Sequence, residues 1–376
     1  MPISVIEFNN KTYKYESYWG PNNANNYPET NIEWQNRELF LNKLDDTQKA
    51  LHLNKYKPSE FTDCVVCGAK NINKGYYQLN KFRWETGLSH YVNVHKTKPS
   101  EIFIDLIFRY QVHPHTVSVT NARIKKKTIK GIKVVKKSKR YLKVDRNQIL
   151  IMDALMRHGG YKYYEDKKKQ IYRYSEHAGL LDFNDVGLER IVVSGNTNRV
   201  DKYDDEIFLP EGMVDMYDFE YIFHTHPPTP KPGGRATVGI LYEFPSVSDV
   251  FHYIDNYNGG KTQGSIVVAP EGMYIIRKDK VDNKKIKINE NRMFQNFNNI
   301  SNKAQQMAIR QYGDRFTTLK FYSEISQNKK YINMLNSVLN KFSLQIDYYP
   351  RIKDMKGRWV IDTVYLPIYP VEPVVK

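Results

Sequence analysis

Two histidines and one aspartate stand at a spacing that can bind a metal ion. His224 and His226 flank a single threonine just after residues 219–223, an aromatic and β-branched segment that predicts a strand. Side chains two residues apart on a strand point to the same face, so both imidazoles can reach one ion. Asp249 falls in the first turn of a helix predicted from the pattern of residues 250–255. Two imidazoles and a carboxylate leave a fourth position for water, which is typical of a catalytic zinc site.

Each part of this pattern also has an ordinary structural explanation. An H-x-H pair on a strand is more often two unrelated polar residues than a metal site. The segment Ser246-Val247-Ser248-Asp249 is also a capping box, in which a serine caps a helix and an acid follows three residues later. That segment alone favours the cap, whereas all the parts together favour the metal site.

The combined pattern, E…H-[ST]-H-P…S-x-x-D, resembles that of the JAMM metalloproteases, also called the MPN-plus or JAB family. Residues 224–227 and 246–249 match its core. Three further segments resemble the family's catalytic-glutamate segment, its strand, turn and strand after the motif helix, and its first helix. They lie at residues 176–181, 265–277 and 148–160. The resemblance covers about residues 145–280.

The resemblance implies an α/β fold in which helices flank a mixed sheet, as in cytidine deaminases. It also implies zinc-dependent hydrolysis of isopeptide or peptide bonds, most plainly the removal of ubiquitin or a ubiquitin-like modifier. In that scheme His224, His226 and Asp249 hold a catalytic zinc, which lowers the pKa of a bound water toward about 7. Glu176 is the general base, and Ser246 donates a hydrogen bond to the oxyanion.

The choice of Glu176 rests on its surroundings. Within the protease-like region, five other glutamates precede the histidine motif, namely Glu165, Glu189, Glu206, Glu211 and Glu220. Small and apolar residues follow Glu176, as expected where a strand enters a core beside the metal. We expect the adjacent His177 to be a packing residue or a residue that supports the ligands, and not a ligand itself.

One departure from the family pattern lies between the ligands. Nineteen residues separate His226 from Ser246, which is longer than the usual family spacing. Their Pro/Gly-rich composition predicts an ordered or semi-rigid loop beside the active site. It is either a substrate-contacting or gating loop or a passive insertion. A related insertion is expected in the large-DNA-virus branch of the family, which this chain resembles.

A second candidate metal site lies near the N-terminus. Cys64 and Cys67 are the chain's two cysteines, and His90 and His95 follow on a helix predicted around residues 84–95. This pattern resembles a two-Cys, two-His zinc finger that holds a second, structural zinc. The twenty-two residues between Cys67 and His90 exceed the usual spacing of about 12–15. The alternatives are a redox dithiol, or free thiols beside core histidines.

The positive charge is concentrated in one segment. The chain carries a net charge of +16, and residues 123–143 contain eleven Lys/Arg and no acids. The segment is either a solvated linker or hairpin, a contact for nucleic acid or another polyanion, or a nuclear address. His113-Pro114-His115 is too short and isolated to indicate a metal site, and we interpret it as structural.

The chain is long enough for several domains. Its 376 residues contain neither a secretory signal nor an apolar run that could span a membrane. We therefore expect a soluble intracellular protein, in the host cytoplasm or nucleus or in a virion. The predicted parts are a zinc-finger-like module (1–122), a basic linker (123–144), a JAMM-like protease domain (145–280) and a small α+β extension (281–376). Within the extension, residues 293–312 predict a helix, and residues 344–349 and 359–365 predict a hairpin.

Two other functions compete with a zinc-dependent isopeptidase. The first is a catalytically silent scaffold of the same fold, against which the presence of all five motif residues argues. The second is a nucleic-acid-associated binding protein that acts through the zinc module and the basic segment.

Overall fold

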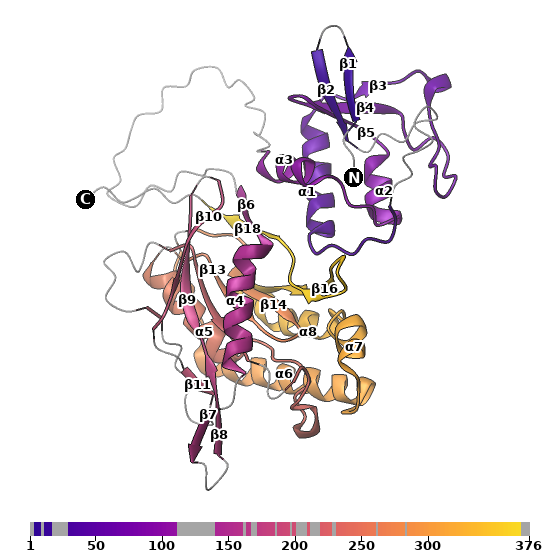
Figure 1. Cartoon of the computed structure of the whole chain (residues 1–376). Coiled ribbons are helices and arrows are strands. Elements are labelled where there is room, and N and C mark those ends of the chain that lie inside the picture. The colour runs from indigo at the N-terminus through magenta and orange to yellow at the C-terminus, as the bar shows by residue number, and fades with distance from the viewer. Residues whose placement is uncertain are drawn as a thin grey trace, which may run out of the picture. The chain divides into compact units, whose positions relative to one another are not determined.

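The computed structural model of the chain describes residues 4–8, 11–16, 29–110, 140–160, 163–166, 171–184, 186–195, 198–200, 209–210, 219–227, 231–260, 262–282 and 284–369. The chain divides into two compact units, an N-terminal unit that extends to Tyr141 and a C-terminal unit that begins at Leu142 (Figure 1). Both units combine sheets with helices, so the expected mixed α/β class is confirmed. None of the described helices is long and apolar enough to span a membrane.

The N-terminal unit is built on a five-stranded sheet in the order β1-β2-β5-β4-β3. Its strands are β1 (Ser4–Phe8), β2 (Lys11–Glu16), β3 (Asn54–Lys55), β4 (Gly75–Leu79) and β5 (Phe82–Glu85). Its helices are α1 (Arg37–Ala50), α2 (Leu88–Val94) and α3 (Glu101–Arg109), and it also has a short 3₁₀ turn, η2 (Pro58–Glu60). The core is aromatic: Phe40, Trp84 and Phe103 are buried with edge-on ring contacts. Trp84 therefore lies on a strand. The helix predicted from residue 84 begins only at Leu88, because residues 82–85 pair with β4 and β2.

A six-stranded sheet forms the centre of the C-terminal unit, in the order β10-β9-β12-β13-β14-β15. The strands are β9 (Ala178–Phe183), β10 (Leu188–Val193), β12 (Tyr221–Thr225), β13 (Gly264–Val268), β14 (Gly272–Lys278) and β15 (Leu344–Pro350). Only β12 and β13 run parallel in this sheet. Parallel neighbours need a crossover, and here it contains α5 (Val247–Gly259).

Helices cover both faces of this sheet. Because side chains alternate along a strand, Tyr274 and Ile276 of β14 pack in one core, with α5, α6 (Glu290–Tyr312) and α8 (Lys330–Leu339). Met273 and Ile275 pack in the other core, with α4 (Arg146–Gly159) (Figure 1). Nearly every residue of the central strands is buried. The sequences of such strands are continuous apolar runs, without alternation between apolar and polar residues.

Shorter elements complete the C-terminal unit. One is the two-stranded sheet of β6 (Arg140–Val144) and β18 (Val364–Ile368), and another is the three-stranded sheet of β7 (Tyr163–Asp166), β8 (Ile171–Glu176) and β11 (Asn198–Val200). A hairpin joins β16 (Ile352–Lys353) and β17 (Trp359–Val360). The short helical segments are η3 (Ala236–Val238), α7 (Thr318–Lys320), η4 (Phe321–Ile325) and η5 (Asn340–Phe342). The helix predicted at 293–312 is confirmed as part of α6. The hairpin predicted from 344–349 and 359–365 is confirmed only next to its turn, where β16 pairs with β17. Its first strand is wrong, because β15 instead pairs along its whole length with β14.

Candidate metal centres

The two histidines and the aspartate of the motif converge at one end of the central sheet. His224 is in β12, His226 follows the strand, and Asp249 is in the first turn of α5. The Asp249 Oδ1 atom lies 3.0 Å from His224 Nε2, and Oδ2 lies 3.5 Å from His226 Nε2. The two Nε2 atoms are 3.2 Å apart. These ligand atoms lie within 4.8 Å of one another, as a shared metal ion requires.

Ser246 and Asp249 also form the predicted capping box. The Ser246 Oγ atom accepts a hydrogen bond from the Asp249 amide at 3.2 Å, and the Ser246 amide donates to Asp249 Oδ2 at 2.6 Å. The cap satisfies backbone amides that the helix leaves unpaired at its start. It also fixes the buried Asp249 carboxylate at the end of the central sheet that carries the two histidines. The two explanations of this motif are therefore compatible.

Glu176, at the end of β8, belongs to the same neighbourhood. In the β9–β12 pairing His224 is opposite Ala178, so continuing that register brings Glu176 level with His226. A hydrogen bond of 2.9 Å from the His177 amide to Thr225 Oγ1 agrees with this register. Burial raises the pKa of Glu176, whereas the charges of His226 and His224 act in the opposite direction. Glu176 is therefore close enough to the histidines to interact with them electrostatically.

The rival glutamates lie elsewhere or outside the described side chains. Glu189 is exposed on β10, and Glu220 accepts a hydrogen bond from the Phe183 amide at 3.0 Å. The side chains of Glu165, Glu206 and Glu211 lie outside the described part of the structure. Of the glutamates whose side chains are described, Glu176 is the one whose position fits the sequence hypothesis best.

The His177 side chain contacts His158 instead of the three candidate metal ligands. Its Nε2 atom lies 3.1 Å from Nδ1 of His158, near the end of α4, and the His177 side chain is buried. Burial lowers the pKa of His177, and His158 adds to that effect. The described ligand cluster of His224, His226 and Asp249 does not include it.

The nineteen-residue insertion contacts the ring nitrogen of His226 that does not face Asp249. Of these residues, 228–230 lie outside the described part of the chain. His226 Nδ1 lies 3.1 Å from the backbone oxygen of Glu243, which leaves Nε2 free to face Asp249. Metal-binding histidines usually engage their second nitrogen in this way. Sequence analysis missed this contact, because a backbone carbonyl leaves no signature in residue type.

The Glu243 side chain is itself fixed by a salt bridge. Arg235 donates to both of its carboxylate oxygens, through Nε at 2.9 Å and through Nη2. Burial alone would lower the pKa of Arg235, but Glu243 raises it, with smaller contributions from Glu271 and Glu176. Arg235 is thus a cation within electrostatic range of the Glu176 carboxylate, and the sequence analysis did not single it out.

The insertion is also packed against the helices that follow it. Gln305 of α6 accepts from the amides of Leu241 and Tyr242 and donates to the Tyr242 carbonyl at 2.6 Å. The Tyr242 hydroxyl donates to the Ile325 carbonyl at 2.7 Å, and its ring stacks on Phe244. The described part of the insertion is therefore an ordered structure.

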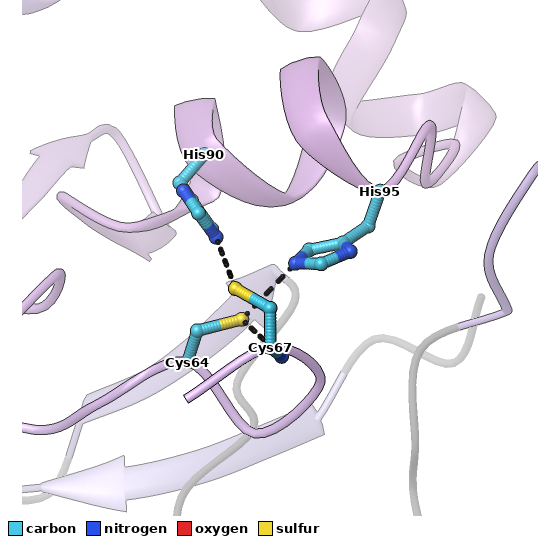
Figure 2. Close-up of side chains that lie close together, drawn as sticks. All are labelled: Cys64, Cys67, His90 and His95. Carbon is cyan, nitrogen blue, oxygen red and sulfur yellow. Dashed lines mark hydrogen bonds between the residues drawn. The ribbon is translucent and has the colours of Figure 1, made fainter. Parts of the chain in front are cut away.

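The four predicted ligands of the N-terminal site also lie together (Figure 2). The imidazoles of His90, on α2, and His95, just after it, point toward the two sulfur atoms. Cys67 Sγ lies 3.4 Å from His90 Nε2, and Cys64 Sγ lies 3.2 Å from His95 Nε2. All four ligand atoms lie within 4.8 Å of one another.

The turn that carries the cysteines favours a thiolate. The amides of Val66 and Cys67 donate to Cys64 Sγ at 3.4 and 3.5 Å. Burial alone would raise the pKa of Cys64, but these amides lower it below the ordinary value of a thiol. Gly68 closes the turn with a φ of +71°, a conformation that glycine adopts without strain. A thiolate is the form of cysteine that binds metals.

Two features of the sequence fall outside the described residues. They are the motif His113-Pro114-His115 and most of the basic segment 123–143, of which only residues 140–143 are described. Polyanion binding by this segment therefore stays a prediction.

Comparison with known proteins identifies a viral relative. The chain is 30% identical over 348 residues to "Uncharacterized protein R413" of Acanthamoeba polyphaga mimivirus, and the match covers 87% of this chain and 93% of that protein. No protein-family model and no solved structure matches the chain.

Proposed function

This chain belongs to the same protein family as the mimivirus protein R413, and we propose that it is a zinc-dependent hydrolase of the JAMM type. Its expected reaction is the cleavage of isopeptide or peptide bonds. The observation that carries this proposal is the convergence of His224, His226 and Asp249, with Glu176 beside them.

The donor set fits zinc. Two imidazole nitrogens and one carboxylate are the ligands of known catalytic zinc sites, which keep one further position open. Asp249 and His224 are almost fully buried, and the carboxylate faces both Nε2 atoms. When bound, zinc would act as a Lewis acid and would make a water molecule acidic enough to lose a proton near neutral pH.

Glu176 is suited to move that proton. Of the acids described near the ligands, Asp249 is held by the capping box and Glu243 by Arg235, which leaves Glu176 for proton transfer. The raised pKa of Glu176 brings it closer to neutral pH, where a group can both accept a proton and return it. In the proposed reaction Glu176 accepts a proton from water and then donates it to the leaving amine.

Ser246 has a hydrogen available for the substrate. The helix cap uses the Ser246 oxygen as an acceptor, which leaves the hydroxyl hydrogen able to donate elsewhere. We propose that it donates to the oxyanion formed when the amide carbonyl is attacked. Removing one donor of this kind costs about 10²–10³ in kcat in other hydrolases.

The substrate is inferred from the family resemblance. We propose that the reaction removes ubiquitin or a ubiquitin-like modifier, whose C-terminal carbonyl is attacked, from the amine that carries it. The mixed sheet, with α4 on one face and α5 on the other, supports a JAMM-like fold for residues 145–280.

For the N-terminal unit we propose a structural zinc. Cys64, Cys67, His90 and His95 supply four ligand atoms, which closes the coordination shell as structural sites do. The ion would tie α2 to the turn at residues 64–68, and metal binding would then contribute directly to folding.

Cleavage assays test the catalytic proposal. The purified full chain is incubated with ubiquitin dimers of each linkage and with ubiquitin-like fusions, beside Glu176→Gln, a chelator-treated sample and the control Glu189→Gln. We expect wild type and Glu189→Gln to cleave at least one substrate, and the other two samples to cleave none. Cleavage by Glu176→Gln would overturn the assignment of the base. The absence of cleavage by zinc-loaded wild type would favour a silent scaffold.

A further inference from the structure

The C-terminal unit contains a cavity of 690 Å³ that includes none of the proposed catalytic residues in its wall. The cavity is bounded by α4 and by residues 351–361 of the C-terminal hairpin region, with Pro232 of the insertion and Pro270 completing the wall. Its volume is in the range of small-molecule sites, about 300–1,000 Å³. The cavity is therefore a candidate ligand site in its own right.

Four arginines line this cavity, and two aspartates hold them in place. Asp153 of α4 accepts hydrogen bonds from Arg157 at 3.0 Å and from Arg351 at 2.5 Å. Asp354, at the turn of the hairpin, bonds Arg146 at 2.7 Å and Arg358 at 3.0 Å. Each carboxylate thus balances only one of its two guanidinium groups. With the nearby acid Glu271 counted as well, the cluster keeps an excess of at least one positive charge, and Arg157 and Arg358 carry it where solvent reaches.

Arg351 is the most deeply placed of these cations. Its side chain is 1% exposed, and its Nε and Nη2 atoms donate to the carbonyls of Pro270 and Ala269. The remaining nitrogen, Nη1, has no hydrogen-bond partner among the described residues. Because Nη1 is buried and Arg351 lies within electrostatic range of Glu271, Arg351 contributes positive charge beneath the cavity, and direct contacts to a ligand fall to the exposed Arg157 and Arg358.

The other part of the wall is aromatic and apolar. Trp359 and Tyr322 stack with their ring centroids 5.6 Å apart. Leu150 and Val360 extend this surface, and Leu150 is 54% exposed although it lines the cavity. Aromatic faces stack with planar rings, and arginines recognise phosphate or carboxylate oxygens in pairs. The two parts of the wall therefore suit the two ends of one molecule.

We propose that this cavity binds a small organic anion that carries a planar ring, with a nucleoside monophosphate as its representative. The phosphate contacts the arginine side of the wall, and the base stacks against the Trp359 side. The limited volume of 690 Å³ favours a small molecule over a longer peptide segment. This inference is independent of the proposed hydrolase activity.

Calorimetric titration of the full chain tests it with three probes: AMP, inorganic phosphate and adenosine. We expect AMP to bind at least about tenfold more tightly than either of the other two, because only AMP reaches both parts of the wall. The same result is expected after chelator treatment of the protein, which separates this site from the metal centres.

Variants locate the binding. Arg157 and Arg358 are 60% and 61% exposed, so replacing both with Gln leaves the fold intact. We expect this double variant to bind AMP at least about tenfold more weakly than wild type. We expect Trp359→Leu to lower the affinity for AMP and to leave the affinity for phosphate unchanged. Arg310→Gln, an exposed arginine of α6, is the control. Equal affinities for AMP and phosphate, unchanged binding in the double variant, or no binding of AMP at millimolar concentration would each overturn the proposal.

Discussion

His226 presents its Nδ1 atom to the carbonyl oxygen of Glu243 at 3.1 Å, so a residue of the long insertion sets the orientation of a candidate metal ligand. Arg235 in turn fixes the Glu243 side chain within the same insertion. The insertion therefore has a structural connection to the site, whatever contact it makes with a substrate. A purely passive insertion would not need such a connection.

Replacing Arg235 tests this connection. In Arg235→Leu the Glu243 side chain loses its partner, so the carbonyl that holds His226 becomes less fixed. We expect zinc affinity at the C-terminal site to fall about tenfold, the lower end of the effect seen when groups supporting metal ligands are removed. Competition with a chromophoric chelator measures the affinity, with Arg310→Leu as the matched control. Equal zinc affinity in the two variants would contradict the role given to Arg235.

Ser246 is expected to affect both stability and turnover. Ser246→Ala removes the oxygen that caps α5, which costs about 0.5–2 kcal/mol of unfolding free energy. It also removes the proposed oxyanion donor, so kcat should fall about 10²–10³-fold. Ser246→Gly costs only a few tenths of a kcal/mol at a helix cap and has no side-chain donor. Stability restored without turnover in this variant would support the catalytic role, and recovery of both would refute it.

Two glycines of the insertion should differ in their tolerance of a side chain. Both have positive φ, +66° at Gly233 and +87° at Gly239, where an L-residue costs about 1–2 kcal/mol. A Cβ at Gly233 would lie 2.4 Å from the Phe316 ring, whereas one at Gly239 would meet nothing within 4 Å. We expect Gly233→Ala to lower the unfolding free energy clearly more than Gly239→Ala. Equal losses in denaturant melts would mean that the insertion does not pack on Phe316.

Glu85 should make the N-terminal unit less stable at high pH. Burial raises the pKa of Glu85 to about 7, even though the Tyr56 hydroxyl donates to its carboxylate. Between its ordinary pKa of 4.5 and about 7, the folded state binds the proton more tightly than the unfolded state. Unfolding free energy therefore falls as the pH rises through this window, by about 3 kcal/mol at most.

The variant Glu85→Gln isolates that effect. It keeps an acceptor for Tyr56 and has no charge to bury, so its unfolding free energy should lose this part of the pH dependence. Tryptophan fluorescence follows the N-terminal unit through Trp34 and Trp84, both buried there. If the unfolding free energies of wild type and variant change in parallel between about pH 4 and pH 8, burial of the charged Glu85 carboxylate carries no such cost.

Local patterns predicted the parts of the molecule whose geometry is local. His224 and His226 share a face because they are two residues apart where β12 ends, and Ser246 and Asp249 are joined by a helical cap. The Cys64 and Cys67 turn likewise forms within a few residues. In each of these cases the backbone period fixes the relative position of the side chains.

Long-range pairing was beyond the reach of these patterns. Asp153 and Arg351 meet although they lie 198 positions apart in the sequence, and nothing in either segment indicates the other. The same holds for β15, whose alternating pattern fits a hairpin as well as the edge of β14 that it joins. Only the packed tertiary structure decides between such alternatives.

The most direct test of the account is the zinc content of the purified full chain after dialysis, measured by mass spectrometry. We expect two zinc ions per chain in wild type, one in His226→Gln and one in Cys67→Ser, because each variant loses a ligand of a different site. Wild type without zinc, or His226→Gln that retains both ions, would contradict the assignment of His224, His226 and Asp249 as a metal centre.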